Sequence, residues 1–186
     1  MTTSTEAGSI PGYVAGTWEI DPVHSEVGFA VRHMMVSKVR GKFDKFAGQI
    51  VTGPDLLQSS VTAEIDLASI NTGQEQRDAH IRSADFFDVD NHAAMTYRST
   101  GVRAEGDHYV LDGDLTLKGV TRQVPLTLEL NGFGPDAYGG TRAGFTATGE
   151  INRKDFGVDF GGVQNGVVVV ADKVTLHLEI EAVLNA

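Results

Sequence analysis

The chain has 186 residues, no cysteine and a formal net charge of −10, from 25 acidic and 15 basic residues. This acidic balance argues against a nucleic-acid partner and gives no polybasic attraction to an anionic membrane surface. The missing cysteines exclude disulfides, thiolate nucleophiles and Cys-ligated zinc. No run of about 18 apolar residues occurs, so neither a membrane-spanning helix nor stable membrane insertion is expected.

The first residues differ in composition from the rest of the chain. Residues 1–15 are rich in Thr, Ser and Gly, and we expect them to form a flexible N-terminal arm. They contain no basic stretch followed by an apolar one, which predicts no signal peptide and a cytoplasmic protein; a periplasmic or secreted protein would need a signal that has been removed. No linker divides the remainder, so residues 16–186 are expected to form a single domain.

Nine segments with one-sided apolar rows follow the arm. In each of them apolar and polar residues alternate, which is the two-residue period of a half-buried β-strand. The rows lie at residues 18–20, 27–33, 39–43, 61–67, 95–99, 111–117, 124–130, 143–147 and 174–180. The row of Val27, Phe29, Val31 and His33 ends in a titratable imidazole, so it is either ordinary core or the wall of an apolar site with a polar handle.

One stretch breaks the alternation. Residues 74–82 contain good helix formers without a two-residue period, which predicts a short α-helix around residues 73–83, capped by Asn71 or Thr72. The many one-sided strands must bury their apolar faces, and either a closed barrel or a two-sheet sandwich does so. An eight-stranded barrel has about the size that holds one small ligand.

Few residues form reactive constellations. The six histidines show no metal-ligand spacing, so no metal site is expected. Arg77, Asp78 and His80 lie within one helical turn; they suit general acid–base chemistry, but we favour charged hydrogen bonds that tie the helix to the sheet. No G-x-S-x-G motif occurs, and we assign no catalytic residue. Met34 and Met35 are flexible thioethers that suit an adaptable apolar surface, either in a pocket or in ordinary packing.

The chain resembles the YceI-like family in four motifs that occur in the family's order. They are IDPVHS at 20–25, RDAHIRSADFF at 77–87, GDLTLKGVT at 113–121 and INRKDFG at 151–157. The resemblance extends over about residues 17 to 183. It implies an all-β fold, an extended eight-stranded antiparallel lipocalin-like β-barrel with a short helix. It also implies an apolar tunnel that binds polyisoprenoids or similar amphiphilic chains, including isoprenoid quinones, without an established catalytic activity.

The leading hypothesis is therefore a lipid-binding module that stores or transports a long-chain amphiphile and needs no cofactor. Its partner would be a hydrophobic small molecule (a polyisoprenoid, a quinone or a fatty chain), and a homodimer is the commonest arrangement if the protein associates. The expected ligand-binding residues are inward-facing or near strand and helix ends: Val27, Phe29, Val31, His33, Met34, Met35, Phe43, Phe46, Ile65, Leu67, Phe86, Phe87, Met95, Tyr97, Leu115, Leu117, Phe145 and Phe156. His33 and Tyr97 are the candidates for orienting a polar head group.

Two alternatives belong to other functional classes. The first is an enzyme that acts on a lipid or quinone held in the barrel, with His33 or His80 as the acid–base group. The second is a stress-related structural protein whose barrel is filled by side chains and takes no ligand. Whether the interior of the barrel is hollow or filled by side chains distinguishes the second alternative from a binding protein.

Overall fold

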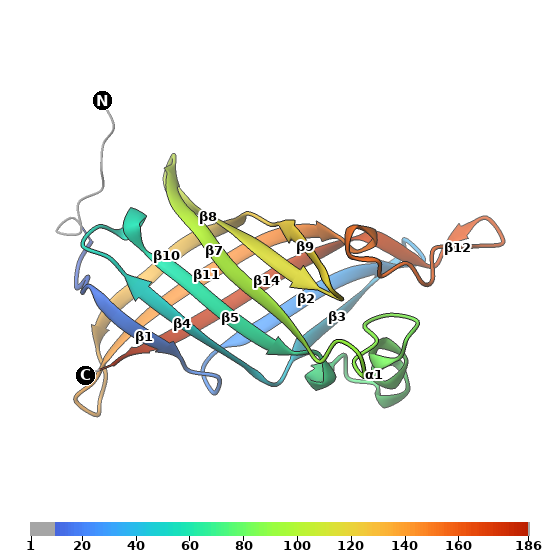
Figure 1. Cartoon of the computed structure of the whole chain (residues 1–186), viewed down its shortest axis with the longest axis horizontal. Helices are drawn as coiled ribbons and strands as arrows, with labels where there is room; N and C mark the ends of the chain where they lie inside the picture. Colours follow the sequence, from blue (N-terminus) through green and yellow to red (C-terminus); the bar gives the residue numbers. More distant parts are fainter. Residues whose placement is uncertain (1–9, 186) are drawn as a thin grey trace.

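The alternating rows close into a β-barrel in the computed structural model, which describes residues 10–185. Eight antiparallel strands form the closed wall, and the last of them pairs with the first through Trp18 and Leu184. In order around the barrel they are β1 (Gly16–Ile20), β4 (Phe46–Thr52), β5 (Ser60–Asp66), β7 (Ala94–Glu105), β8 (His108–Leu117), β10 (Leu126–Pro135), β11 (Thr141–Asn152) and β14 (Val170–Leu184). The expected eight-stranded antiparallel barrel is confirmed (Figure 1).

A hairpin extends one side of this wall. Strand β14 pairs with β1 near its C-terminal end, and its earlier part pairs with β2 (Glu26–His33). Strand β2 pairs in turn with β3 (Ser37–Phe43), whose last residues pair with the short β6 (Ile70–Asn71). The barrel is therefore longer on this side than the eight-stranded ring alone.

The remaining elements are short. Strand β9 (Val120–Gln123) pairs with β8, while β12 (Val163–Gln164) and β13 (Val167–Val168) form a separate hairpin. The described part of the chain has three 3-10 helices: η2 (Leu56–Gln58), η3 (Leu67–Ser69) and η4 (Arg153–Phe156). In Figure 1, helix α1 (Glu75–Arg82) and the β12 hairpin lie toward one end of the long axis, and the last residues of β14 lie at the other. No helix within residues 10–185 has the length and hydropathy to cross a membrane.

The helix confirms the expectation of a short α-helix around residues 73–83, but its cap is different. Gln74 is the N-cap, and its side-chain oxygen accepts a hydrogen bond from the Arg77 N–H at 3.1 Å. Thr72 instead donates its N–H and its hydroxyl to Asp78 Oδ1. Neither Asn71 nor Thr72 is therefore the N-cap. Thr72 precedes the N-cap by two residues and bonds to the side chain of Asp78 in the first turn of the helix.

Two strand assignments from the sequence were incomplete. Strand β4 was missing from the nine rows, because its inward positions include Gly48 and Thr52 and the alternation is weak. The row at 124–130 was treated as one segment, but β9 ends at Gln123 and β10 begins at Leu126. Pro125 lies in the gap, and it has no N–H to donate to a ladder.

One end of the barrel is packed with aromatic residues. Trp18 is fully buried, and its indole N–H donates to Thr52 Oγ1 at 2.8 Å. The rings of Trp18 and Phe145 both pack edge-on against Phe133, with centroids 5.7 and 5.8 Å away. Residues 1–9 of the expected N-terminal arm lie outside the described residues, while Tyr13 donates its hydroxyl to the Gly53 carbonyl at 2.7 Å. Because side chains fill this end of the barrel, the cavity lies in the rest of the interior.

Candidate ligand-binding cavity

A cavity of about 510 Å³ extends along the inside of the barrel. Its lining comes from every strand of the closed wall and from β2, β3 and α1, and it is almost entirely aliphatic and aromatic. No Asp or Glu occurs among the residues within 10–185 that line it. Pockets of about 300–1,000 Å³ with apolar walls and few polar groups are typical of small-molecule sites. A barrel filled by its own side chains is contradicted by this open interior.

The structure places fourteen of the eighteen expected residues on the cavity wall. They are Val27, Phe29, Val31, His33, Phe43, Phe46, Ile65, Phe86, Phe87, Met95, Tyr97, Leu115, Leu117 and Phe145. The strand residues converge because every second residue of a barrel strand points inward, whereas Phe86 and Phe87 reach the cavity from the turn after α1. Contact of these side chains with a ligand stays a prediction.

Four of the expected residues do not line the cavity. Met34 and Met35 form the turn between β2 and β3 and are 47% and 54% exposed. Leu67 and Phe156 are fully buried in the 3-10 helices η3 and η4, where they pack in the core. Leu67 was expected on a strand, but β5 ends at Asp66, whose side chain caps η3 by accepting from the Ala68 N–H.

The sequence analysis also missed part of the wall. Further inward residues of the last strands line the cavity, among them Leu126, Leu128, Ala147, Leu176, Leu178 and Ile180. Their rows were visible as alternation, and only the closure of the barrel shows that they face the same space. One of the missed polar residues is Arg153, which lies within the motif at 151–157.

Arg153 organises the chain that follows η4. Its guanidinium is 4% exposed and donates to the carbonyls of Val158, Phe160, Ala171 and Val170, at 2.7, 2.6, 3.0 and 3.2 Å. Burial lowers the pKa of Arg153 from its ordinary value, and Asp172 and Asp159 oppose that shift. Since these carbonyls belong to the segments before β12 and after β13, one side chain fixes both ends of this hairpin at the cavity.

Aromatic rings surround the cavity beside α1. The His80 ring packs edge-on against Phe86 and Phe160, with centroids 5.1 and 4.9 Å away, and these two phenylalanines are 5.3 Å apart. His80 Nε2 also lies 2.8 Å from Asp85 Oδ2. Lining residues that are themselves exposed, including Arg32, His80 and Phe160, gather at this end. The cavity therefore reaches the surface between α1 and the β12–β13 hairpin.

The two expected polar handles differ in their bonding. Tyr97 donates its hydroxyl to the Val124 carbonyl at 2.8 Å, and burial, with Asp112 and Asp114 adding to it, raises its pKa far above the ordinary value. The His33 ring makes no hydrogen bond with any residue in the part of the chain that the structure describes. His33 therefore has both ring nitrogens available to a ligand, whereas the Tyr97 proton is committed to the backbone.

Arg77 and Asp78 form the expected charged hydrogen bonds, but these tie α1 to Thr72, the residue after β6, and not to a strand of the sheet itself. Arg77 Nε donates to Thr72 Oγ1 at 2.8 Å, and its Nη2 donates to the Thr72 carbonyl at 2.9 Å. Asp78 accepts from the same residue. These bonds position the helix beside the cavity and leave His80 at its exposed edge.

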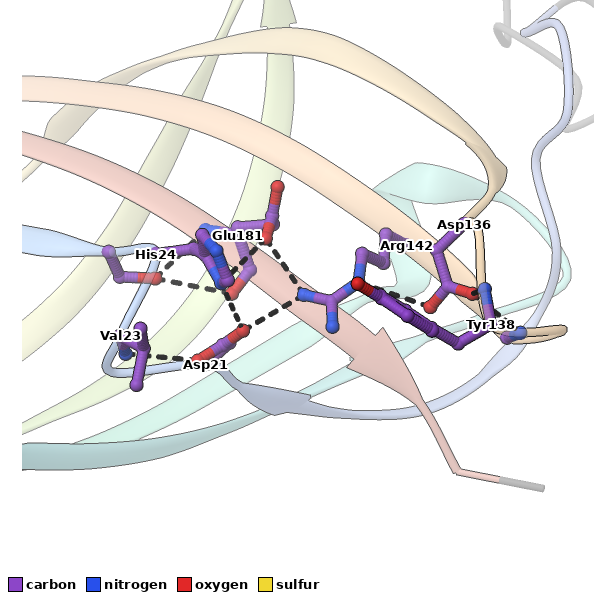
Figure 2. A network of polar contacts seen from close by, with 9 residues as sticks. Asp21, Val23, His24, Asp136, Tyr138, Arg142 and Glu181 are labelled. Atoms are coloured by element: carbon purple, nitrogen blue, oxygen red, sulfur yellow. Dashed lines mark hydrogen bonds and ion pairs between the residues drawn. The ribbon is translucent and has the colours of Figure 1, made fainter.

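A polar cluster lies on the outside of the barrel, near the packed end. Asp21, His24 and Glu181 bring their ligand atoms within 4.8 Å of one another, a spacing that could hold a cation (Figure 2). Arg142 Nη1 already lies between the carboxylates, 2.9 Å from Asp21 and 2.8 Å from Glu181, and its Nε donates to Asp136. Because one guanidinium bridges these carboxylates, the arrangement is an ion-pair network that joins the loop after β1 to β11 and β14.

Known proteins share both the sequence and the barrel. Residues 18–182 match the model of the YceI-like domain. The YceI protein of Escherichia coli O157:H7 is 38% identical over 148 residues, 78% of each chain. A relative from Vibrio cholerae is 37% identical over 158 residues, which are 84% of this chain and 81% of the relative.

Solved structures agree with this assignment. Burkholderia cenocepacia BcnA superimposes with a TM-score of 0.75 at 25% identity, over 87% of this chain and 98% of BcnA. A polyisoprenoid-binding domain from Saccharophagus degradans has the same fold, with a TM-score of 0.68 at 17% identity over 92% of this chain and all of that domain. From the match over residues 18–182 and these relatives, the chain belongs to the YceI-like family.

Proposed function

We propose that this protein binds one long-chain amphiphilic lipid, a polyisoprenoid or an isoprenoid quinone, inside the barrel. The observation that carries the proposal is the apolar cavity of about 510 Å³, which extends along the barrel and has no carboxylate in its described lining. Burial contributes about 0.8 kcal/mol per methylene, so an extended hydrocarbon chain can bind tightly with few polar contacts. The description of the Saccharophagus degradans domain as polyisoprenoid-binding supports the same ligand class.

The polar groups of the cavity favour a ligand whose head accepts hydrogen bonds. The titratable side chains along the lining, apart from Tyr97, are arginines and histidines, and His33 has a free ring. Quinone carbonyls, carboxylates and phosphates are acceptors of this kind. We propose that the head lies near His33 and the chain extends toward Phe145.

Extraction and mass spectrometry test the proposal directly. The protein is purified without detergent, extracted with organic solvent, and the extract is compared with that of an unrelated barrel protein handled identically. We expect about one prenyl lipid per chain, and saturable rebinding of prenyl alcohols of increasing length by the emptied protein. Protein that is empty when purified and shows no affinity for these alcohols contradicts the proposal.

We propose binding without catalysis, since the two imidazoles on the cavity do not form a convergent acid–base pair. His80 lies beside Asp85, whereas His33 has no hydrogen-bond partner among the described residues. Chemical turnover of the captured lipid that disappears in His33→Ala would favour the enzyme instead. The cytoplasmic location and the homodimer stay predictions, to be checked by cell fractionation and light scattering.

A further inference from the structure

Exposed apolar side chains are concentrated at one end of the barrel. Six of the ten large hydrophobic residues that are exposed within residues 10–185 lie on two neighbouring segments at the cavity opening. We call them the apolar rim: Met34, Met35, Val36, Phe160, Val163 and Val167. Single exposed hydrophobic residues are ordinary, but a contiguous group marks an interaction surface.

Two hairpins bring the rim together. The turn from β2 to β3 contains Met34, Met35 and Val36, and the β12–β13 hairpin lies beside it, linked by a hydrogen bond from the Met34 N–H to the Val169 carbonyl at 2.9 Å. The same β12–β13 segment lines the cavity with Gln164. The rim therefore lies beside the opening through which a ligand would pass.

The β2–β3 turn carries apolar residues where other residue types fit the backbone better. Met34 and Met35 have φ angles of 50° and 58°, in the left-handed region that favours Gly and Asn. The neighbouring hairpin uses Asn165 and Gly166 for the same region, with φ of 51° and 76°. Since asparagine would relieve the turn, the two methionines indicate that an exposed apolar tip has a use outside folding.

Basic residues lie directly behind the rim. Between Val27 and Phe43 the hairpin has four of them, at positions 32, 38, 40 and 42, and no acidic residue, although the chain carries −10 overall. Arg32 and Lys38 face each other across the ladder, a like-charge pairing that destabilises a sheet. Neither forms an ion pair with any residue in the described part of the chain.

A second pocket is lined by two of these basic residues, Arg32 and Lys38. It has a volume of about 490 Å³ and lies between the two hairpins. Four basic side chains line it with Asp172 as the one acidic residue; they are Arg32, Lys38, Lys154 and Lys173. Lys154 and Lys173 are paired with Asp172 and Glu150 at 3.4 and 3.5 Å, so Arg32 and Lys38 supply the uncompensated charge. We call Arg32 and Lys38, with Arg40 and Lys42, the basic collar.

We propose that the apolar rim and the basic collar dock the barrel opening onto an anionic lipid bilayer. The rim enters the boundary between head groups and acyl chains, and the collar lies at the depth of the lipid phosphates. The rest of the chain is acidic and is repelled by the same surface, so the charge distribution orients the opening toward the membrane. A second copy of this chain fits less well, because a two-fold contact would place one collar against the other.

Docking goes beyond the proposed function and is measured apart from it. The full chain is sedimented with vesicles of phosphatidylcholine alone, and with vesicles in which about a third of the lipid is phosphatidylglycerol. Neither contains a prenyl lipid. We expect binding to the anionic vesicles that weakens as salt is added, and little binding to the neutral ones. Absence of binding to both vesicles, or equal binding to both, overturns the proposal.

Two double variants test the two parts of the surface. Arg32→Gln with Lys38→Gln is expected to weaken partitioning about 30-fold. The control, Arg98→Gln with Arg122→Gln, makes the same change of net charge on β7 and β9 and is expected to bind within about threefold of the wild type. Equal losses in the variant and its control contradict a local collar.

Met34→Asn with Met35→Asn tests the rim without endangering the fold, because asparagine accepts positive φ. We expect an unchanged or higher melting temperature and at least about tenfold weaker partitioning. Light scattering distinguishes the other occupant: a wild-type dimer that this variant converts to monomer, with no vesicle binding, makes the rim a contact between copies. Protein that carries an extractable lipid but ignores vesicles overturns docking alone, and empty protein that still docks overturns the proposed function alone.

Discussion

Arg142 and Asp21 are 121 residues apart in the chain, and the guanidinium Nη1 of Arg142 lies 2.9 Å from Asp21 Oδ2 (Figure 2). The Asp21 side chain also lies 2.7 Å from the His24 ring and is 15% exposed. The pair joins the loop after β1 to β11 at the place where β14 closes the barrel on β1. Closure of the wall and this ion-pair network are therefore formed by the same segments.

Asp21→Asn is expected to destabilise the protein at neutral pH and to make its stability fall less steeply in acid. Hydrogen bonds from His24 and then from Arg142 hold the pKa of Asp21 far below its ordinary value of about 3.9. The folded chain thus keeps this carboxylate ionised where the unfolded chain protonates it, so the stabilisation is present above about pH 4 and is lost as the pH falls below that. We expect a loss of about 1 kcal/mol at pH 7 and a smaller loss near pH 3, from urea unfolding at both pH values.

The exposed Asp90 provides the matched control for this change of charge. Asp90→Asn removes a carboxylate from a loop outside the network, and the free energy of unfolding should follow the wild type at both pH values. If Asp21→Asn costs as much at pH 3 as at pH 7, the Asp21 carboxylate is not a source of the loss of stability in acid.

Tyr97→Phe is expected to change the alkaline limit of stability. Burial raises the pKa of the Tyr97 phenol above its ordinary value of about 10, and Asp112 and Asp114 raise it further. The unfolded chain loses this proton first, so the stabilisation is present below about pH 10 and is lost as the pH rises above it. The variant should lose about 1 kcal/mol at pH 7 with the bond to the Val124 carbonyl, yet decline less steeply above pH 10.

Urea unfolding across the alkaline range measures this effect, and Tyr138→Phe is its control because Tyr138 is 92% exposed. The control should match the wild type at every pH. A slope above pH 10 that is the same in Tyr97→Phe and in the wild type assigns the alkaline loss to other groups.

The sequence predicted the inward faces well because strand alternation depends only on neighbouring residues. Val27 and Phe29 were placed on one face by their spacing, and both line the cavity. Strand β4 was missed because Gly48 lies on its inward row, where the Ile20 side chain covers it. When the side chain of a neighbouring strand fills the space above a glycine, the glycine adds no apolar residue to the alternating pattern of its own strand.

The size of the interior was beyond the sequence for a different reason. Whether a barrel is hollow depends on strand number, tilt and stagger, which are properties of the closed sheet. Leu67 and Phe156 illustrate this limit. Both are large apolar residues of the kind that line the wall, but both lie in 3-10 helices, where they are buried in the core. The role of Arg153 was hidden similarly, since its partners are backbone carbonyls that carry no sequence signal.

Arg153→Met is expected to loosen the segment that carries the β12–β13 hairpin. The variant leaves four carbonyls without their charged donor, so we expect a loss of about 3 kcal/mol in the free energy of unfolding. Hydrogen exchange of the Val169 and Val170 amides, which donate to Gly162 and Gly161, should accelerate more than exchange in β11. Lys154→Met, on the exposed neighbour, is the control; uniform acceleration in Arg153→Met would indicate a global effect and no local anchoring.

Ala63→Phe is expected to shorten the chain that the cavity accepts. Ala63 lies on β5, faces the cavity and is only partly buried, so a larger side chain extends into open space and does not overpack the core. Each methylene that is displaced costs about 0.8 kcal/mol of binding, so the loss of two methylenes weakens a long prenyl alcohol about tenfold. Shorter alcohols that do not reach Ala63 should bind as they do to the wild type. Ala104→Phe adds the same volume at an exposed position near the end of β7, where Ala104 does not line the cavity, and should leave binding unchanged. Titration of both variants with alcohols of increasing length measures this difference, and equal affinities of Ala63→Phe and Ala104→Phe for the longest alcohol would mean that the ligand lies outside the barrel.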